Sequence, residues 1–179
     1  MRKLFYITVI FFWVIPFGFA QLKSYSFEEV EKLAIQNPKP IIVYIHTNWC
    51  KYCAIMENST LKNQDIIQML NEQFYFVVLN AESKNDITFN NYIFKYKPTG
   101  QNTGIHELAT ALATVNKQVS YPTITILDTK KDILFQKQSY LKAKELIRIL
   151  EKTQEIAIFE KNSFPNPWNT IIIFLPVLV

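Results

Sequence analysis

The chain contains few cysteines and glycines and carries little net charge. It has only 2 cysteines and 3 glycines among 179 residues. So few cysteines exclude a disulfide-stapled scaffold, and so few glycines exclude collagen-like and glycine-rich linker classes. Of the 19 basic residues, Arg2 and Lys3 lie in an N-terminal leader, so the remaining basic residues exceed the 15 acidic ones by only two. That balance predicts no nucleic-acid partner, whereas a 49% hydrophobic content is enough to form a buried core.

The first twenty residues have the layout of a secretory signal peptide. Arg2 and Lys3 precede an apolar run from Leu4 to Ile15, and small residues, Gly18 and Ala20, occupy the −3 and −1 positions of a cut after Ala20. We therefore predict a signal peptide over 1–20 and an exported protein, periplasmic or secreted. The alternative is an uncleaved membrane anchor, although the run is at the short limit for a span.

The rest of the chain alternates between helical and strand patterns. Ser26 and Glu29 fit a capping box, and the strands at 41–45 and 74–79 are continuous apolar runs, as in strands buried on both faces. Asn90-Asn91 fits a two-residue hairpin turn between 87–89 and 92–94. The predicted helices are 27–36, one beginning near Cys50, 64–73, 105–115 and 141–154, and the later strands begin at 124 and 133. We therefore predict one domain over 21–155 and a C-terminal tail over 156–179.

Cys50 and Cys53 form a C-x-x-C pair at a strand-to-helix turn, which is typical of a redox pair. The first turn of a helix has unpaired N–H groups and a partial positive charge, both of which stabilise a thiolate. We therefore predict that Cys50 is the nucleophile. Cys53, one turn into the helix, then resolves the mixed disulfide, while Trp49 screens one side of the sulfur.

Two stretches resemble the active site and the cis-proline loop of the thioredoxin superfamily. They are Trp49-Cys50-Lys51-Tyr52-Cys53, and Tyr121-Pro122-Thr123 before a later strand. The resemblance covers 26–154 and implies an α/β thioredoxin fold, with a central mixed sheet flanked by helices and a hairpin or loop inserted before the third core helix. It implies that Pro122 is cis and that the backbone of Tyr121 pairs with a substrate strand. Met56 and the stretch 61–79 resemble the exported proteins related to the DsbD C-terminal domain.

Two departures from that pattern stand out. Many thioredoxins carry a buried acid at the position of Tyr44, and a tyrosine does not accept a proton in the same way near neutral pH. Without that acid, we expect either water or Glu57 to take the proton of Cys53. The alternative for Glu57 is a solvated charge on the helix surface with no such role. The second departure is the segment 86–104, whose aromatic residues form either a small satellite core or a contact for a protein substrate: Phe89, Tyr92, Phe94 and Tyr96.

The main interpretation is a thiol-disulfide oxidoreductase that reduces protein disulfides and receives electrons from a membrane thiol-disulfide donor, without a cofactor or a metal. An oxidase or isomerase is the alternative enzyme, and Lys51 favours it because a nearby positive charge stabilises the thiolate. The alternative without catalysis is a module that only binds a partner or that holds a metal through Cys50, Cys53 and His46. His106 is predicted to be a surface or helix-capping residue.

The end of the chain gives no clear function. Residues 163–168 look like an extended linker, and the apolar run 171–179 is too short to cross a bilayer. The sequence does not indicate an oligomeric state.

Overall fold

A computed structural model describes residues 21–163. The predicted leader over 1–20, the linker from 164 onward and the apolar run 171–179 lie outside the described residues. Within the described part, no helix is both long and apolar enough to span a membrane.

The core of the fold is a mixed four-stranded sheet in the order β10-β9-β1-β2. β1 (Ile41–His46) pairs in parallel with β2 (Tyr75–Asn80) and antiparallel with β9 (Thr123–Leu127), which pairs antiparallel with β10 (Ile133–Gln138). The parallel pair and the helices between its strands form the predicted βαβ unit, and the predicted fold class is confirmed.

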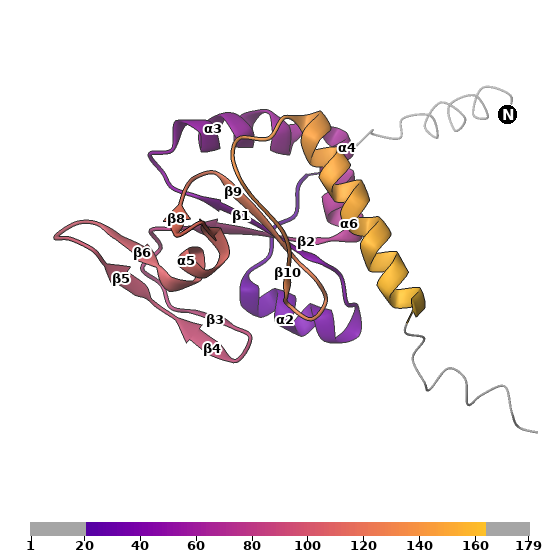
Figure 1. Cartoon of the computed structure of the whole chain (residues 1–179), viewed down its shortest axis with the longest axis horizontal. Helices are drawn as coiled ribbons and strands as arrows, with labels where there is room; N and C mark the ends of the chain where they lie inside the picture. The colour runs from indigo at the N-terminus through magenta and orange to yellow at the C-terminus, as the bar shows by residue number, and fades with distance from the viewer. Residues whose placement is uncertain (1–20, 164–179) are drawn as a thin grey trace, which may run out of the picture.

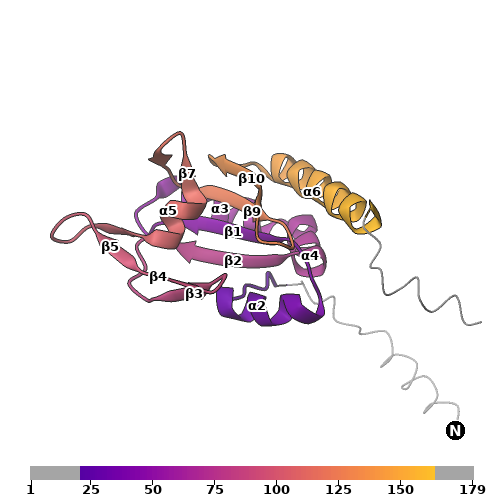
Figure 2. The same cartoon turned by 60° about the horizontal axis from the view of Figure 1, so that its bottom comes forward.

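Helices cover both faces of the sheet (Figures 1 and 2). α2 (Phe27–Gln36) and α5 (Glu107–Ala113) pack on one face, while the other face is covered by α3 (Lys51–Asn58), the 3₁₀ turn η1 (Thr60–Lys62), α4 (Gln64–Gln73) and α6 (Ala143–Ser163). Each face buries its own apolar cluster, since successive residues of a strand point to opposite sides. The sheet therefore forms the middle layer of three.

The helix boundaries follow from local capping. The predicted capping box of α2 is present, because Ser26 Oγ accepts the N–H of Glu29 at 3.1 Å and the Glu29 carboxylate accepts the N–H of Ser26 at 2.7 Å. α4 begins and ends at the predicted residues and is capped by Asn63. The last helix differs from its prediction: α6 begins at Ala143 and continues to Ser163, beyond the expected end at Gln154.

The segment between β2 and α5 forms two hairpins. β3 (Ile87–Phe89) and β4 (Tyr92–Phe94) are joined by Asn90 and Asn91 at φ of 54° and 60°, as the sequence predicted. The expected loop after them is instead a second hairpin, β5 (Tyr96–Pro98) with β6 (Gly104–His106), which projects from the body of the domain (Figures 1 and 2). The sequence also did not indicate the short hairpin β7 (Thr114–Val115) with β8 (Gln118–Val119).

The aromatic residues of this segment divide between core and surface. Phe89 is buried in the cluster beneath α2, where its ring meets Phe27 edge-on with centroids 5.0 Å apart, and Phe94 packs against the same cluster. Tyr92 is more than half exposed. The β3–β4 hairpin therefore packs against the main core and does not form a separate satellite core.

His106 is a capping residue but is not on the surface. Its side chain is fully buried, with Nδ1 accepting the N–H of Leu108 at 3.2 Å and Nε2 lying 3.1 Å from the carbonyl of Asn85. The tautomer with its hydrogen on Nε2 satisfies both bonds. His106 thus joins the start of α5 to the segment after β2.

Candidate redox site

Cys50 and Cys53 form a disulfide at the start of α3, with Cα atoms 5.2 Å apart. Cys50 is the N-cap residue, and its sulfur accepts the backbone N–H of Cys53 at 3.1 Å. The helix therefore begins at the predicted position. A helix N-terminus carries unpaired N–H groups and a partial positive charge, which would stabilise a Cys50 thiolate in the reduced protein.

The two cysteines differ in their solvent exposure. Cys50 is 7% exposed and Cys53 only 1%. Lys51 and Tyr52, between them, are exposed, and Trp49, just before Cys50, is 69% exposed. An incoming group from solvent therefore meets Cys50 first, beside an exposed aromatic and basic surface.

Trp49 is held at this surface by two residues from elsewhere in the chain. Its indole Nε1 donates to Glu82 Oε1 at 2.9 Å, and its ring meets Tyr121 edge-on, with centroids 6.1 Å apart. Sequence reasoning missed Glu82. The signal was available in principle, because Glu82 follows β2 and the carboxyl ends of parallel strands meet at one edge of a sheet.

The Tyr121-Pro122 loop lies beside the end of β1. The peptide bond between Tyr121 and Pro122 is cis, and Thr123, the next residue, pairs with Ile45 of β1. The Tyr121 hydroxyl is buried without a hydrogen-bond partner among the described residues. Burial, followed by the nearby Glu82 carboxylate, raises the pKa of Tyr121 above its usual value, so the hydroxyl stays protonated.

A second group of polar side chains lies behind the disulfide. The Tyr44 hydroxyl is 3.1 Å from the carbonyl oxygen of Cys53 and 3.2 Å from Glu57 Oε1. His46 stacks parallel to the Tyr44 ring at 5.5 Å, and its Nδ1 lies 3.6 Å from Glu57 Oε1. Burial and the Glu57 carboxylate together raise the pKa of Tyr44 strongly. Glu57 is therefore hydrogen-bonded within a cluster, not simply solvated.

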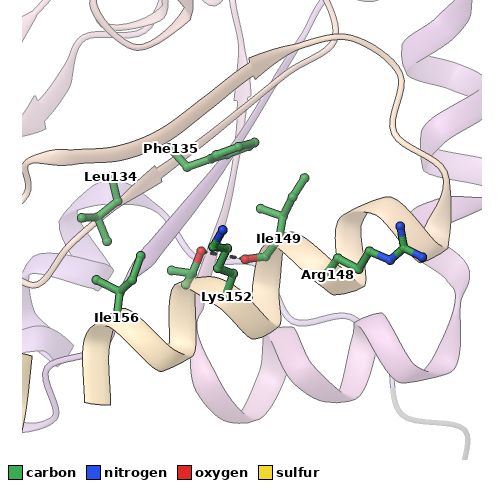
Figure 3. Close-up of a pocket in the computed structure, with 7 residues that line it drawn as sticks. Leu134, Phe135, Arg148, Ile149, Lys152 and Ile156 are labelled. Atoms are coloured by element: carbon green, nitrogen blue, oxygen red, sulfur yellow. Dashed lines mark hydrogen bonds between the residues drawn. The ribbon is translucent and has the colours of Figure 1, made fainter. Parts of the chain in front are cut away.

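Two of the cavities in the described part of the chain bear on the site. One, of about 490 Å³, has Tyr44, His46 and Glu57 in its wall. The other, of about 240 Å³, lies between β10 and α6, with Leu134, Phe135, Ile149 and Ile156 around it (Figure 3). No residue of the disulfide motif lines the second cavity.

The described residues contain no group of three or more His, Cys, Asp or Glu side chains placed to hold a metal ion. His46, which the metal hypothesis paired with the two cysteines, is placed beside Glu57 instead. The arrangement around Cys50 and Cys53 is suited to thiol-disulfide exchange, which needs one accessible sulfur and one nearby sulfur to displace it.

A model of the thioredoxin-like domain matches residues 27–154. The chain belongs to the thioredoxin-like family. The match spans α2 to most of α6 and includes both cysteines and the Tyr121-Pro122 loop. A search of curated proteins by sequence found no significant match.

Solved structures agree with this thioredoxin-like fold at low sequence identity. A thioredoxin from Thermus thermophilus is 19% identical with a TM-score of 0.55, covering 76% of this chain and 89% of that one. A DsbH oxidoreductase is 18% identical with a TM-score of 0.52, covering 75% and 85%. The DsbD C-terminal domain of Neisseria meningitidis is 15% identical with a TM-score of 0.46, covering 70% and 90%. The closer resemblance to the DsbD group therefore stays a prediction.

The structure brings the predicted site residues of this thioredoxin-like protein together at one end of the sheet. Cys50 and Cys53 are bonded, Trp49 contacts Tyr121, and Pro122 follows Tyr121 beside β1. Their roles in catalysis stay predictions.

Proposed function

We propose that this thioredoxin-like protein reduces disulfide bonds in other proteins. The observation that carries the proposal is the disulfide at the N-terminus of α3, whose outer cysteine, Cys50, is the more accessible. In the reduced protein, the Cys50 thiolate attacks a substrate disulfide, and a mixed disulfide forms. Cys53 then attacks Cys50, which releases the reduced substrate and regenerates the Cys50–Cys53 bond.

The surroundings of Cys50 support a polypeptide substrate. Trp49 and Tyr52 are large, exposed aromatic residues on either side of Cys50, and such side chains are enriched where proteins bind one another. The Tyr121-Pro122 loop next to this surface offers backbone groups to an extended segment, as the family resemblance implies.

Trapping of the mixed disulfide tests the proposal. With Cys53→Ser, the second step is impossible, so a protein substrate accumulates bonded to Cys50 and is released by dithiothreitol. Cys50→Ser is the matched control and captures nothing; it also abolishes reduction of insulin disulfides. The proposal fails if Cys53→Ser traps no substrate or if Cys50→Ser retains reductase activity.

One observation favours the opposite direction, the formation of disulfides. Lys51 is exposed directly after Cys50, and a positive charge there stabilises the thiolate and hence the reduced form of the pair. The reduction potential decides between the two: a reductase is expected near the thioredoxin value of about −270 mV, and an oxidase nearer about −120 mV.

We propose further that the protein works outside the cytoplasm and is kept reduced by a dithiol donor in the membrane. The leader pattern of 1–20 supports export, and thiols in an oxidising compartment persist only with a supply of electrons. Alkylation of intact cells with a membrane-impermeant maleimide tests this, because exported Cys50 is labelled only while the donor is active.

A further inference from the structure

The segment that follows the predicted cleavage site is attached to the domain from its first residue. The Gln21 carbonyl oxygen accepts a hydrogen bond from Asn71 Nδ2 at 2.9 Å, and the Lys23 N–H donates to Asn71 Oδ1 at 2.9 Å. Both bonds involve one side chain, which lies in the last turn of α4. A cut after Ala20 therefore leaves an N-terminus that lies against α4.

The next residues continue this attachment along the edge of the sheet. Leu22 packs against the apolar cluster that contains the disulfide. The Tyr25 N–H donates to the Phe76 carbonyl oxygen at 2.9 Å, and Tyr25 forms a parallel bridge with Val77. Because β2 is the last strand of the four-stranded sheet, the segment 22–25 covers part of an otherwise open edge.

Gln21 differs from the residues that follow it in what its side chain does. The residue is exposed and lies in the wall of the cavity of about 490 Å³. Its main-chain carbonyl, and not its side-chain amide, forms the bond to Asn71. The side chain can therefore rotate at the surface while the main chain stays in place.

We propose that the mature chain begins with Gln21 and that this residue closes on itself to form a pyroglutamyl end, a five-membered lactam. This inference rests on the proposed export of the chain, which supplies the cut after Ala20, and it is independent of the cysteine chemistry. An α-amino group titrates near neutral pH, so part of it is the uncharged, nucleophilic amine. The amine and the amide belong to one residue, so their reaction is intramolecular and needs no encounter between molecules.

The reaction balances without a further reactant. The α-amino nitrogen of Gln21 forms a bond with the side-chain carbonyl carbon, Cδ, and the bond between Cδ and Nε2 breaks. Nε2 leaves as ammonia, taking one hydrogen from the amine, and no atom is oxidised or reduced. The main-chain carbonyl of Gln21 lies outside the new ring, so its hydrogen bond from Asn71 remains.

Closure changes the chemistry of the N-terminus without changing its attachment. The lactam nitrogen is an amide and carries no charge, whereas a free α-amine is partly protonated near neutral pH. Aminopeptidases act on a free α-amine, so the closed end is not their substrate. The lactam thus protects the segment 22–25, whose removal would uncover Leu22's neighbours in the core and the outer edge of β2.

Mass spectrometry of the N-terminal peptide tests the inference. The full-length chain is expressed with its leader in an exporting cell, and the intact mass is measured on freshly isolated protein before cleavage after Glu28 releases the first peptide. We expect this peptide to be lighter than its unmodified form by the mass of one ammonia molecule. Edman sequencing should give no residue until pyroglutamyl aminopeptidase removes the lactam, after which Leu22 is read first.

The matched control is Gln21→Glu, which keeps the size of the side chain. It presents a carboxylate, which is a much poorer electrophile than an amide. We expect its N-terminal peptide to have the unmodified mass and its Edman sequence to begin with the substituted residue. Loss of ammonia from this variant as well would place the modification at another residue and reject the inference.

The other outcomes separate this inference from the proposals made above. A wild-type peptide that begins at Gln21 with its full mass overturns the lactam and leaves export intact. A peptide that begins at another residue, or a chain that retains its leader, overturns the inference together with the predicted cleavage site. Neither result affects the proposed reduction of disulfides, which trapping with Cys53→Ser tests separately.

Discussion

The two faces of the central sheet bury similar numbers of large apolar side chains but differ in their chemistry. Toward α2 and α5, β1 directs Ile41, Val43 and Ile45 into a mainly apolar cluster that contains neither cysteine. Toward α3, α4 and α6, the alternate positions of the same strand include Tyr44, in a cluster that contains the disulfide. The first face holds neither cysteine, and the second carries the disulfide together with Tyr44, whose hydroxyl bonds Glu57.

This division predicts that substitutions on the two faces separate stability from thiol chemistry. A change beneath α5 lowers the free energy of unfolding but leaves the reduction of insulin disulfides intact. A change around Tyr44 does the reverse. The predictions below run from the largest expected effect on stability to the smallest.

Leu108→Ala should destabilise the fold most. Leu108 is 1% exposed, in the apolar cluster beneath α5, and truncation of such a leucine costs about 2–5 kcal/mol because a cavity remains. Urea unfolding of the oxidised protein measures the loss. At a temperature where the variant is folded, its rate of insulin disulfide reduction should match that of the wild type. Slower reduction in the folded variant would show that the two faces are coupled.

His106→Ala should have the second-largest effect. The buried imidazole accepts the N–H of Leu108 and bonds the carbonyl of Asn85. Removal leaves buried backbone groups unpaired, at a cost of about 1–3 kcal/mol. The amide protons at the start of α5 should then exchange faster in hydrogen-exchange experiments, while those of α4 stay protected. An unchanged unfolding free energy would mean that water replaces the ring without loss.

Tyr44→Phe should separate chemistry from stability most clearly. The ring and its stacking on His46 remain, so the unfolding free energy should fall by only about 1 kcal/mol, the typical worth of one hydrogen bond. The reduction of insulin disulfides should slow, because the hydroxyl that links the Cys53 carbonyl with the Glu57 carboxylate is lost. A large loss of stability with unaffected insulin reduction would show that Tyr44 acts only in the packing of the core.

The predictable parts of this molecule were those governed by local patterns. The apolar run of β1, the caps of α2 and α4, the Asn90-Asn91 turn and the redox pair at the start of α3 all follow from neighbouring residues. The hairpin β5–β6 was missed, because each strand is only three residues long and its pairing depends on contacts far along the chain. The end of α6 was misplaced because no local stop signal follows Gln154.

The site was only partly predictable for the same reason. The spacing of Cys53 and Glu57 on one helical face was readable from the sequence, whereas the hydrogen bond of Glu57 to Tyr44 depends on how α3 packs over β1. Glu82 reaches Trp49 only through the parallel register of β1 and β2. His106 was expected at the surface or as a cap, and its complete burial depends on contacts with the segment after β2, where its N–H donates to the Ala81 carbonyl and its Nε2 lies 3.1 Å from the Asn85 carbonyl.

Glu107→Gln should have the smallest effect, and one that depends on pH. Hydrogen bonds from the Lys97 ammonium at 2.9 Å and the Lys95 N–H at 2.7 Å lower the pKa of this carboxyl. A carboxyl whose pKa is lower in the folded protein stabilises the fold at higher pH and loses this contribution as the pH falls through its folded value. The variant should therefore be slightly less stable than the wild type at pH 7. The difference should vanish in acid, once the pH lies below the lowered pKa of Glu107 and both proteins carry an uncharged group at this position. A difference that persists in acid would instead assign the effect to side-chain shape.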